Sequence, residues 1–296
     1  METLSAVRLA AITALANAGV PSPGVDADLL LCHVLGITRS ELKLRELRGD
    51  SFGGDERAQF TELVAARRTR IPLQHLTGLA YFRYLELKVG PGVFTPRPET
   101  ETVVQLGLDF IAERGLDEPT CIDLCSGSGA IAAALASEVP GSKVWAVELS
   151  DQAIGYTRSN CLPLGVTVLH QDATSVPAEL EATMDLVISN PPYIPPNAIP
   201  REAEVRDHDP QMALYGLGED GLQIPRAISA QAMKLLRPGG YFVMEHAEVQ
   251  EASAAAMLRE AGFERVEGHL DLTGRSRATS GYAPHRQAVP PTTHRA

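Results

Sequence analysis

Asn190 opens a four-residue turn, Asn-Pro-Pro-Tyr, that directly follows the apolar run 186–188. Its carboxamide oxygen can accept a hydrogen bond, and so can the carbonyl of Pro191, a residue that has no backbone N–H. Because two successive prolines restrict the backbone, we expect these two acceptors to be held at a fixed spacing. A planar –NH2 group, which carries two donors, fits such a pair, and the ring of Tyr193 can stack on it.

A second turn is rich in glycine and follows another short apolar run. Residues 121–125 (CIDLC) are expected to form a strand, and the turn 126–129 (Ser-Gly-Ser-Gly) leads from it into a helix. Glycine in a strand-to-helix turn permits positive φ and lets a ligand approach the backbone closely. Glu148 ends the next expected strand, nineteen residues after Gly129, where a carboxylate can accept hydrogen bonds from ribose hydroxyls.

These features together predict a nucleoside-bearing cofactor, either a dinucleotide or S-adenosylmethionine. Asn190 and the glycine turn would lie at the same edge of a parallel sheet, where ligands bind. Beside a methyl sulfonium, two fixed acceptors could aim a weakly nucleophilic amide nitrogen at the methyl carbon and stabilise its N–H bonds as they gain positive character. We therefore predict Asn190, Pro191 and Tyr193 as catalytic residues, and the whole turn, Pro192 included, as the substrate-binding segment.

The positioning elements follow from the pattern after residue 100, where apolar strands and amphipathic helices alternate. This pattern predicts six strands, at 121–125, 143–149, 166–170, 184–189, 241–246 and 263–272. The helix before the fifth strand is expected to end at Pro238. Repeated strand–helix units indicate an α/β fold with a parallel, doubly wound sheet and helices on both faces.

Four regions are expected along the chain. They are an N-terminal helical domain for substrate docking (1–78), a β-hairpin linker (79–98), a catalytic domain (99–280) and a disordered tail (281–296). Alternation over residues 80–95 predicts the hairpin, with the chain turning at Gly90-Pro91-Gly92. The proline-bearing segment 194–216 is expected to act as a lid or docking loop.

Composition limits the possible partners and location. The 296 residues include 44% hydrophobic and 21% charged residues, and no apolar run approaches the length of a membrane span. A net charge of −11 disfavours non-specific binding to nucleic acid. Four cysteines without a CxxC pair or a histidine-rich partner predict neither a metal site nor a disulfide framework, so the cytoplasm is the expected compartment.

Sequence motifs over residues 24–279 resemble the HemK/PrmC family of protein-(glutamine-N5) methyltransferases. The motifs are PLQHLTGLAYF (72–82), VFTPRPETE (93–101), DLCSGSGAIA (123–132), ISNPPYI (188–194) and DPQMALYGLGEDGL (209–222). The resemblance implies a Rossmann-like class I methyltransferase fold with a seven-stranded, mainly parallel sheet and a small N-terminal helical bundle joined by a β-hairpin. It also implies S-adenosylmethionine as cofactor and the glutamine of the Gly-Gly-Gln motif in class I peptide chain release factors as the methylated group.

Residue roles follow from the same resemblance. The turn 125–129 would contact the methionine part of the cofactor, Glu148 the ribose, and Asp172 with Ala173 the adenine. The implied cofactor-binding residues are Cys125, Ser126, Gly127, Ser128, Gly129, Glu148, Asp172, Ala173 and Asn190. Cys125 stands where the family usually has glycine, so a positive φ there would strain it. A capping role is the alternative for Asp172.

Other functions remain open on sequence grounds. An amino-methyltransferase acting on adenine or cytosine in nucleic acid would use the same Asn-Pro-Pro-Tyr turn, but the net charge and the lack of a basic reading domain argue against it. A non-enzymatic cofactor-binding protein would show no turnover that depends on Asn190. A nicotinamide dehydrogenase would leave the proline pair without a role. The expected protein is a monomer with no membrane partner.

Overall fold

The computed structural model describes residues 2–285, which divide into two compact units. Within the described residues, the first unit comprises 2–80, 89–91 and 199–209, and the second comprises 81–88, 92–198 and 210–285. Each unit has its own hydrophobic core. The chain therefore leaves the first unit after residue 80 and returns to it twice, at 89–91 and at 199–209.

The first unit is a small helical bundle, as the sequence predicts for the N-terminal region. Its elements are α1 (Leu4–Asn17), α2 (Pro23–Leu35), α3 (Arg39–Arg48), α4 (Gly54–Arg68), α5 (Leu73–Thr77), α9 (Ala203–His208) and the paired strands β1 (Glu2–Thr3) and β2 (Ser51–Phe52). A capping box between Thr38 and Glu41 begins α3, and left-handed glycines end several helices. Leu15, Leu30 and Phe60 are buried where the helices meet.

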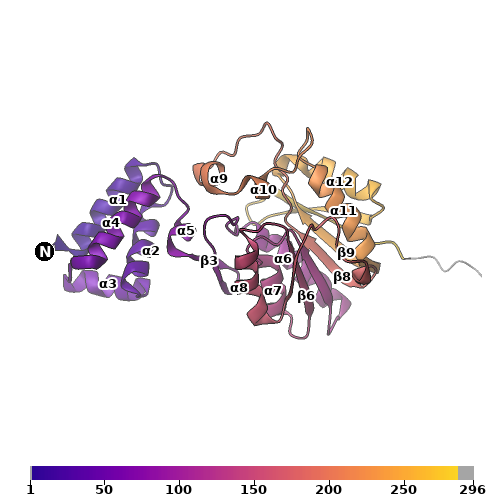
Figure 1. Ribbon diagram of the computed structural model, residues 1–296, viewed down its shortest axis with the longest axis horizontal. Coiled ribbons are helices and arrows are strands. Elements are labelled where there is room, and N and C mark those ends of the chain that lie inside the picture. The colour runs from indigo at the N-terminus through magenta and orange to yellow at the C-terminus, as the bar shows by residue number, and fades with distance from the viewer. Residues whose placement is uncertain (1, 286–296) are drawn as a thin grey trace, which may run out of the picture. The chain divides into compact units, whose positions relative to one another are not determined.

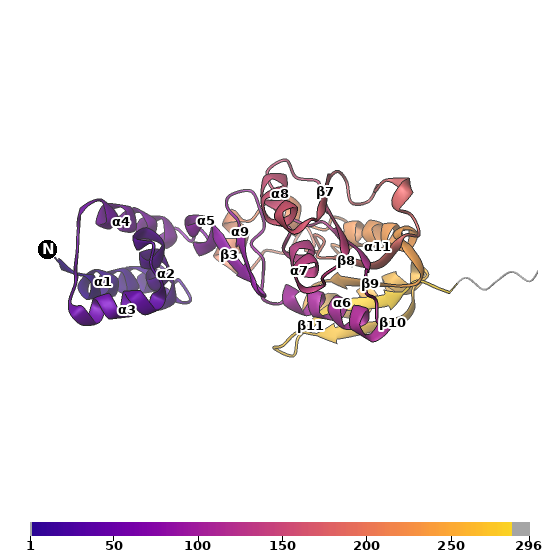
Figure 2. The same ribbon diagram turned by 90° about the horizontal axis from the view of Figure 1, so that it is seen from below.

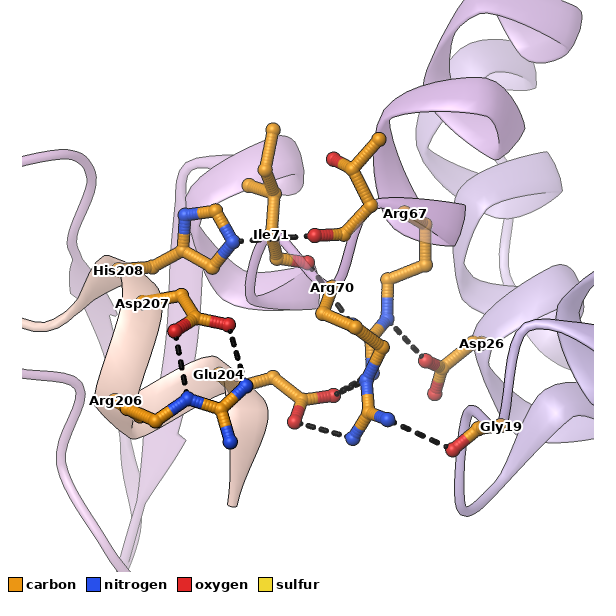
Figure 3. Close-up of polar contacts among 10 residues, drawn as sticks. Gly19, Asp26, Arg67, Arg70, Ile71, Glu204, Arg206, Asp207 and His208 are labelled. Carbon is orange, nitrogen blue, oxygen red and sulfur yellow. Dashed lines mark hydrogen bonds and ion pairs between the residues drawn. The ribbon is translucent and has the colours of Figure 1, made fainter. Parts of the chain in front are cut away.

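Helix α9 belongs to this bundle through a cluster of ion pairs, although it is far from the other helices in sequence. Figure 3 shows Glu204 accepting hydrogen bonds from Arg67 Nη2 at 2.7 Å and from Arg70 Nε at 2.8 Å. Arg67 is 5% exposed, and its Nε also donates to Asp26 Oδ2 at 2.6 Å. Two arginines of the N-terminal region thus hold the segment 199–209 to the helical bundle.

The second unit contains a seven-stranded sheet, which confirms the predicted mainly parallel architecture. Its strands are β5 (Thr120–Leu124), β6 (Lys143–Glu148), β7 (Thr167–His170), β8 (Met184–Ser189), β9 (Leu236–Glu245), β10 (Glu264–Leu270) and β11 (Ser276–Tyr282). They are ordered β10-β11-β9-β8-β5-β6-β7. The five strands from β9 to β7 are parallel, while β11 pairs antiparallel with both β9 and β10.

Helices cover both faces of this sheet (Figures 1 and 2). They are α6 (Thr100–Arg114), α7 (Ala130–Glu138) and α8 (Ile154–Cys161) on one face and α11 (Gln223–Leu235) and α12 (Glu251–Glu260) on the other, with α10 (Gln211–Leu214), η1 (Leu162–Leu164), η2 (Ala178–Leu180) and η3 (Glu248–Gln250) in the connections. Successive residues of β8 serve opposite cores, since Leu186 and Ile188 pack with α6 and α7 while Val187 packs with α11. Burial on both faces explains the unbroken apolar run that precedes Asn190.

The predicted hairpin is present, but its turn lies earlier than expected. Strands β3 (Leu79–Phe82) and β4 (Leu85–Lys88) form a two-stranded sheet connected by Arg83 and Tyr84, so the prediction that Gly90–Gly92 makes the turn was wrong. Arg83 takes φ +51 and its backbone N–H donates to Glu101 Oε1 at 2.9 Å. This side-chain contact compensates for a conformation that is unusual for a residue other than glycine.

Two further differences lie near the end of the sheet. Helix α11 ends at Leu235, and Leu236 is already extended (φ −72°, ψ 137°), so the expected helix end at Pro238 was wrong and Pro238 lies within β9. The strand expected over 263–272 is present as β10, but β11 follows it as a further strand that was not predicted, because its small and polar sequence carries no strand pattern. β11 extends to Tyr282, and residues 286–296 of the expected tail lie outside the described residues.

Candidate functional site

The glycine turn and the Asn-Pro-Pro-Tyr turn begin at the same edge of the sheet. Strands β5 and β8 are adjacent and parallel, with Leu124 paired to Ser189, and the two turns start at the next residue of each strand. Ser189 Oγ donates to the Leu124 carbonyl at 2.6 Å, which ties the two strand ends together. The carboxyl ends of neighbouring parallel strands are the usual ligand site of an open α/β sheet.

Within the glycine turn, two glycines have different structural requirements. Gly129 has φ +83, and a Cβ added there would lie 2.5 Å from Cys161 Sγ, so packing of α7 against α8 excludes a side chain. Gly127 has φ +55, but a Cβ added there would meet nothing within 4 Å. The space beside Gly127 is therefore open to a ligand that approaches the backbone.

Cys125 has φ +66, a left-handed conformation that glycine adopts at much lower cost. The strain anticipated for a cysteine at this position is thus present in the backbone. Its neighbours fix the conformation, since Ser126 N–H donates to the Val147 carbonyl at 2.9 Å and Ser126 Oγ donates to the Asp123 carbonyl at 3.0 Å. The start of the turn is held from both strands.

Glu148 connects the glycine turn to the next loop. Its Oε2 accepts from the Gly127 N–H at 2.6 Å, and its Oε1 accepts from the Ser150 N–H at 2.6 Å. Burial raises the pKa of Glu148, and the backbone donors of Ser150 and Gly127 oppose that rise. A carboxylate offers about four lone-pair sites, so capacity remains for a hydroxyl donor such as that of a ribose.

Asp172 and Ala173 follow β7, the neighbour of β6. Asp172 Oδ1 accepts from both the backbone N–H and the hydroxyl of Thr174, at 2.8 and 2.7 Å. This is the local capping arrangement that the sequence left as the alternative for this residue. None of the hydrogen bonds found within residues 2–285 involves Asp172 Oδ2. Ala173 is buried in the same hydrophobic cluster as Ile122.

Asp123 is a polar residue of this region that the motif analysis did not single out. It is fully buried in β5, its Oδ2 accepts from the Ala132 N–H at 3.3 Å, and its Oδ1 has no hydrogen-bond partner in the described chain. Burial raises the pKa of Asp123 to about 7, and the hydrogen bond from the Ala132 N–H opposes that rise. A buried acceptor without a partner is costly, and a cationic group bound near the turn would offset that cost.

Asn190 is half-buried, and its amide has a defined orientation. Asn190 Nδ2 donates to Thr100 Oγ1 at 3.2 Å, and the Thr100 hydroxyl donates to Glu245 Oε2 at 2.7 Å. Thr100 and Glu245 are 4% and 3% exposed. Among the hydrogen bonds found within residues 2–285, none occupies Asn190 Oδ1 or the Pro191 carbonyl oxygen, and their role as acceptors for a substrate stays a prediction.

The other end of the turn is held from a different side. Tyr193 OH donates to Glu245 Oε1 at 3.2 Å, and the Tyr193 carbonyl accepts from Gln250 Nε2 at 2.8 Å. Burial raises the pKa of Tyr193, and the nearby Glu245 carboxylate raises it further, so the phenol stays protonated. These contacts hold the Tyr193 ring in place, and its phenol is neutral.

The segment 214–221 supports the backbone of the turn. Ile194 N–H donates to the Leu214 carbonyl at 2.8 Å, and Gly216 N–H donates to the Ile194 carbonyl at 3.1 Å. A Cβ added at Gly216 would lie 2.6 Å from the Pro192 oxygen, and one at Gly221 would lie 2.4 Å from the Tyr193 oxygen. The glycines of the motif at 209–222 thus allow close packing under the turn.

Thr100 and Glu245 were missed by the sequence analysis as functional residues. Thr100 lies in the motif 93–101, and Glu245 ends β9, the strand next to β8. A carboxylate at the ligand edge of a neighbouring strand was the available signal, although its contact with Thr100 spans 145 residues.

Family models match most of the chain. Residues 7–78 match the PrmC N-terminal domain, and residues 85–203 match the methyltransferase small domain. A release factor glutamine methyltransferase of Streptomyces coelicolor is 46% identical over 98% of this chain and 100% of that protein. One from Bifidobacterium longum is also 46% identical, over 89% of this chain and 94% of that protein.

A further relative is less similar to this chain and carries a different name. The 4-amino-L-phenylalanine/4-methylamino-L-phenylalanine methyltransferase of Streptomyces pristinaespiralis is 36% identical over 84% of each chain. Among solved structures, a methyltransferase from Pyrococcus furiosus matches with a TM-score of 0.49 at 16% identity, covering 78% of this chain and 98% of that one. Within residues 2–285, no helix has the length and apolar character needed to cross a membrane.

Proposed function

The chain belongs to the family of release factor glutamine methyltransferases, and we propose that it methylates the side-chain amide nitrogen of the glutamine in the Gly-Gly-Gln motif of class I peptide chain release factors. It is a methyltransferase that uses S-adenosylmethionine. The observation that supports an –NH2 group as the methyl acceptor is the orientation of Asn190, because Nδ2 is engaged by Thr100 and leaves Oδ1 to accept from a substrate –NH2.

Residues of the second unit fit S-adenosylmethionine. Open space beside Gly127 suits the methionine part, and the orphan Oδ1 of Asp123 suits a ligand with a cationic ammonium group. We assign the turn 125–129 to the methionine part, Glu148 to the ribose hydroxyls, and Asp172 with Ala173 to the border of the adenine. When bound, the cofactor supplies a methyl group on a sulfonium that is open to attack by a nucleophile.

The Asn-Pro-Pro-Tyr turn prepares the substrate nitrogen. Asn190 Oδ1 and the Pro191 carbonyl each accept one N–H of the glutamine amide, while Pro192 and Tyr193 wall in its flat face. With the cofactor bound, the nitrogen lone pair would take the methyl group from the sulfonium, and the two acceptors would stabilise the N–H bonds as they gain positive character. The extra proton leaves to water afterwards, so no strong base is needed before transfer.

Other substrates are less well supported. The net charge of −11 opposes binding to the polyanionic backbone of nucleic acid. An aromatic amine fits the same two acceptors, and the relative from Streptomyces pristinaespiralis is named for such substrates, so it is tested alongside. We further propose that the enzyme acts as a monomer in the cytoplasm, a compartment consistent with its four free cysteines.

The test uses purified enzyme and S-adenosylmethionine labelled in the methyl group. Three acceptors are compared at equal concentration, namely a class I release factor, duplex DNA and 4-amino-L-phenylalanine, and mass spectrometry locates the label. We expect label on the Gly-Gly-Gln glutamine alone. Label on DNA or on the aromatic amine, with none on the release factor, would overturn the proposed substrate.

Asn190→Ala tests the role of the turn, because it removes the side-chain acceptor from a half-buried position. Transfer to the release factor should fall by about 100-fold or more, by analogy with the loss of one preorganised transition-state contact. Affinity for S-adenosylmethionine should fall far less than the rate of transfer, since the other implied cofactor contacts are kept, and the thermal midpoint should change little. Wild-type turnover by Asn190→Ala would refute the assigned role.

A further inference from the structure

Glu245 lies at the centre of the hydrogen bonds that hold the substrate-binding turn, yet it contacts no expected substrate or cofactor atom. Its two carboxylate oxygens accept from two hydroxyls, Oε2 from Thr100 at 2.7 Å and Oε1 from Tyr193 at 3.2 Å. The donors come from the start of α6 and from the residues that follow β8, while Glu245 ends β9. One buried carboxylate thus connects three elements around Asn190.

The hydrogen count along this chain of contacts sets the direction of each bond. A threonine hydroxyl has one hydrogen, and when Glu245 is ionised that hydrogen must point to the carboxylate. Thr100 Oγ1 can then only accept from Asn190, which requires the amide to present Nδ2 to it and Oδ1 to the opposite side. The charge on Glu245 therefore determines which end of the Asn190 amide faces the substrate.

Protonation removes this constraint. A protonated Glu245 has a donor of its own, which can point to Thr100 Oγ1 and free the threonine hydrogen to donate to Asn190 Oδ1. The Asn190 amide could then rotate by a half turn and present –NH2 to the substrate, where two donors would face each other. The acceptor pair needed to hold a glutamine amide would be lost.

We propose that Glu245 is a positioning residue, which as a carboxylate orients the Asn190 amide through Thr100 and fixes the Tyr193 ring through its hydroxyl. This inference rests on the proposed function, because that function requires Asn190 Oδ1 to accept from the substrate. Glu245 acts through other residues and is not itself assigned to the reacting atoms.

The electrostatic surroundings place the ionisation of Glu245 within the working range of pH. Burial raises its pKa to about 7, and the opposing groups are the Thr100 hydroxyl, the Arg277 guanidinium on β11 and the Tyr193 hydroxyl. The carboxylate of Glu99 adds to the rise. Because the active orientation needs the charged form, turnover should increase as pH rises through about 7.

Two variants test separately the charge of Glu245 and the relay, meaning the hydrogen bonds that link Glu245 through Thr100 to Asn190. Glu245→Gln keeps the shape but cannot ionise, and Thr100→Val removes the hydroxyl between Glu245 and Asn190. Each should lower kcat for release-factor methylation by about 10- to 100-fold, with the affinity for S-adenosylmethionine unchanged. Combined, they should cost little more than either alone, because both break the same relay. Thr100→Ser, which restores the hydroxyl, should recover most of the rate.

The pH profile of kcat supplies a readout that a purely structural role would not give. Wild type should lose rate on the acid side of about pH 7, and Glu245→Gln should lack that inflection. Ser229→Ala is the matched control, since Ser229 is also fully buried and its hydroxyl donates to the Pro225 carbonyl within α11. Circular dichroism and thermal unfolding verify the fold of every variant.

The outcomes distinguish a failure of this inference from a failure of the proposed function. Full activity of Asn190→Ala would defeat the proposed function and the inference with it. An inactive Asn190→Ala together with wild-type kcat in Thr100→Val, or with an unchanged inflection in Glu245→Gln, would overturn the inference alone. Should Glu245→Gln fail to fold, Thr100→Val and its serine rescue decide the question.

Discussion

Arg70 holds Glu204 through two hydrogen bonds across 134 residues of sequence, from Nε to Oε1 at 2.8 Å and from Nη2 to Oε2 at 2.5 Å. Such a parallel pair fixes both the distance and the plane of the carboxylate. Arg67 adds a third donor to the same group (Figure 3). The segment 199–209, which continues the chain from the Asn-Pro-Pro-Tyr turn, is therefore fastened to the N-terminal helical bundle.

Glu204→Gln should loosen this segment. Removing the charge leaves Arg67, which is 5% exposed, with Asp26 as its remaining ionic partner among residues 2–285, and a broken buried pair costs several kcal/mol. Since Arg70 is less buried, we expect a loss of about 1–3 kcal/mol in the free energy of unfolding of the helical bundle. Urea unfolding measures it, and hydrogen exchange should show faster exchange in the amides of 199–209.

A second carboxylate on α9 provides the control. Asp207 pairs with Arg206 at 2.8 Å, but both side chains are 46% exposed, so Asp207→Asn should leave the stability nearly unchanged. The dependence of stability on acidic pH gives a further check on Glu204. Burial opposes the ionisation of Glu204, but hydrogen bonds from Arg70 and Arg67 outweigh it and lower its pKa to about 2. Its stabilisation is present above the normal pKa and is lost as pH falls toward 2, so Glu204→Gln should flatten that acid limb. Equal effects of the two variants would contradict the ion-pair anchor.

The two glycines of the cofactor turn should respond differently to the same change. Gly129→Ala places Cβ 2.5 Å from Cys161 Sγ at a φ of +83, so we expect a loss of about 2–4 kcal/mol in the free energy of unfolding. Gly127→Ala meets no atom within 4 Å and should cost only about 1 kcal/mol, from its φ of +55. Because that space is assigned to the cofactor, Gly127→Ala should weaken S-adenosylmethionine binding at least tenfold, or about 1.4 kcal/mol.

Thermal unfolding and calorimetric titration of S-adenosylmethionine compare the two variants directly. Shortening the opposing side chain gives a further check, since Cys161→Ala should partly restore the stability of Gly129→Ala by removing the clash. The assignment of open space at Gly127 to the cofactor would be refuted by a variant that binds S-adenosylmethionine as wild type does.

Tyr193 should contribute through its ring and its hydroxyl separately. Tyr193→Phe keeps the aromatic wall and loses one hydrogen bond to the buried Glu245, so stability should fall by about 1–2 kcal/mol and kcat by a few-fold. Tyr193→Ala also removes the surface that packs on the substrate amide, so KM for the release factor should rise as well. Steady-state kinetics on both variants measure the split, and an equal KM in the two would argue against the stacking role.

The sequence was sufficient for features whose cause is local. The apolar run of β8 and the glycines after β5 predict strands buried on both faces and a ligand edge, and both turns lie at that edge. Cys125 was expected to be strained if its position required positive φ, and its φ of +66 agrees. In each case the sequence signal lies within a few residues of the feature.

Features set by distant contacts could not be predicted in this way. The turn at Arg83 is favoured by Glu101 and Glu138, which lie 18 and 55 residues further on, whereas Gly90 and Gly92 gave a stronger local signal. The return of 199–209 to the helical bundle depends on side chains more than 130 residues away. Only the folded chain brings these partners together, so no spacing in the sequence records them.

Asp123 should make stability depend on pH at the neutral end of the range. Its folded pKa is raised by burial from 3.8 to about 7, so the stabilisation is fully present below 3.8 and is lost as pH rises through about 7. Asp123→Asn cannot ionise, so it does not lose this stabilisation. The free energy of unfolding of the variant minus that of wild type should rise by about 1–3 kcal/mol between pH 5 and pH 8, which is less than the whole pKa shift of Asp123 would allow. Urea unfolding at several pH values measures the difference, and Asp172→Asn, which changes an exposed carboxylate nearby, serves as control. A constant difference between Asp123→Asn and wild type across this range would show that Asp123 does not titrate there, and its buried Oδ1 would then have to be satisfied in another way.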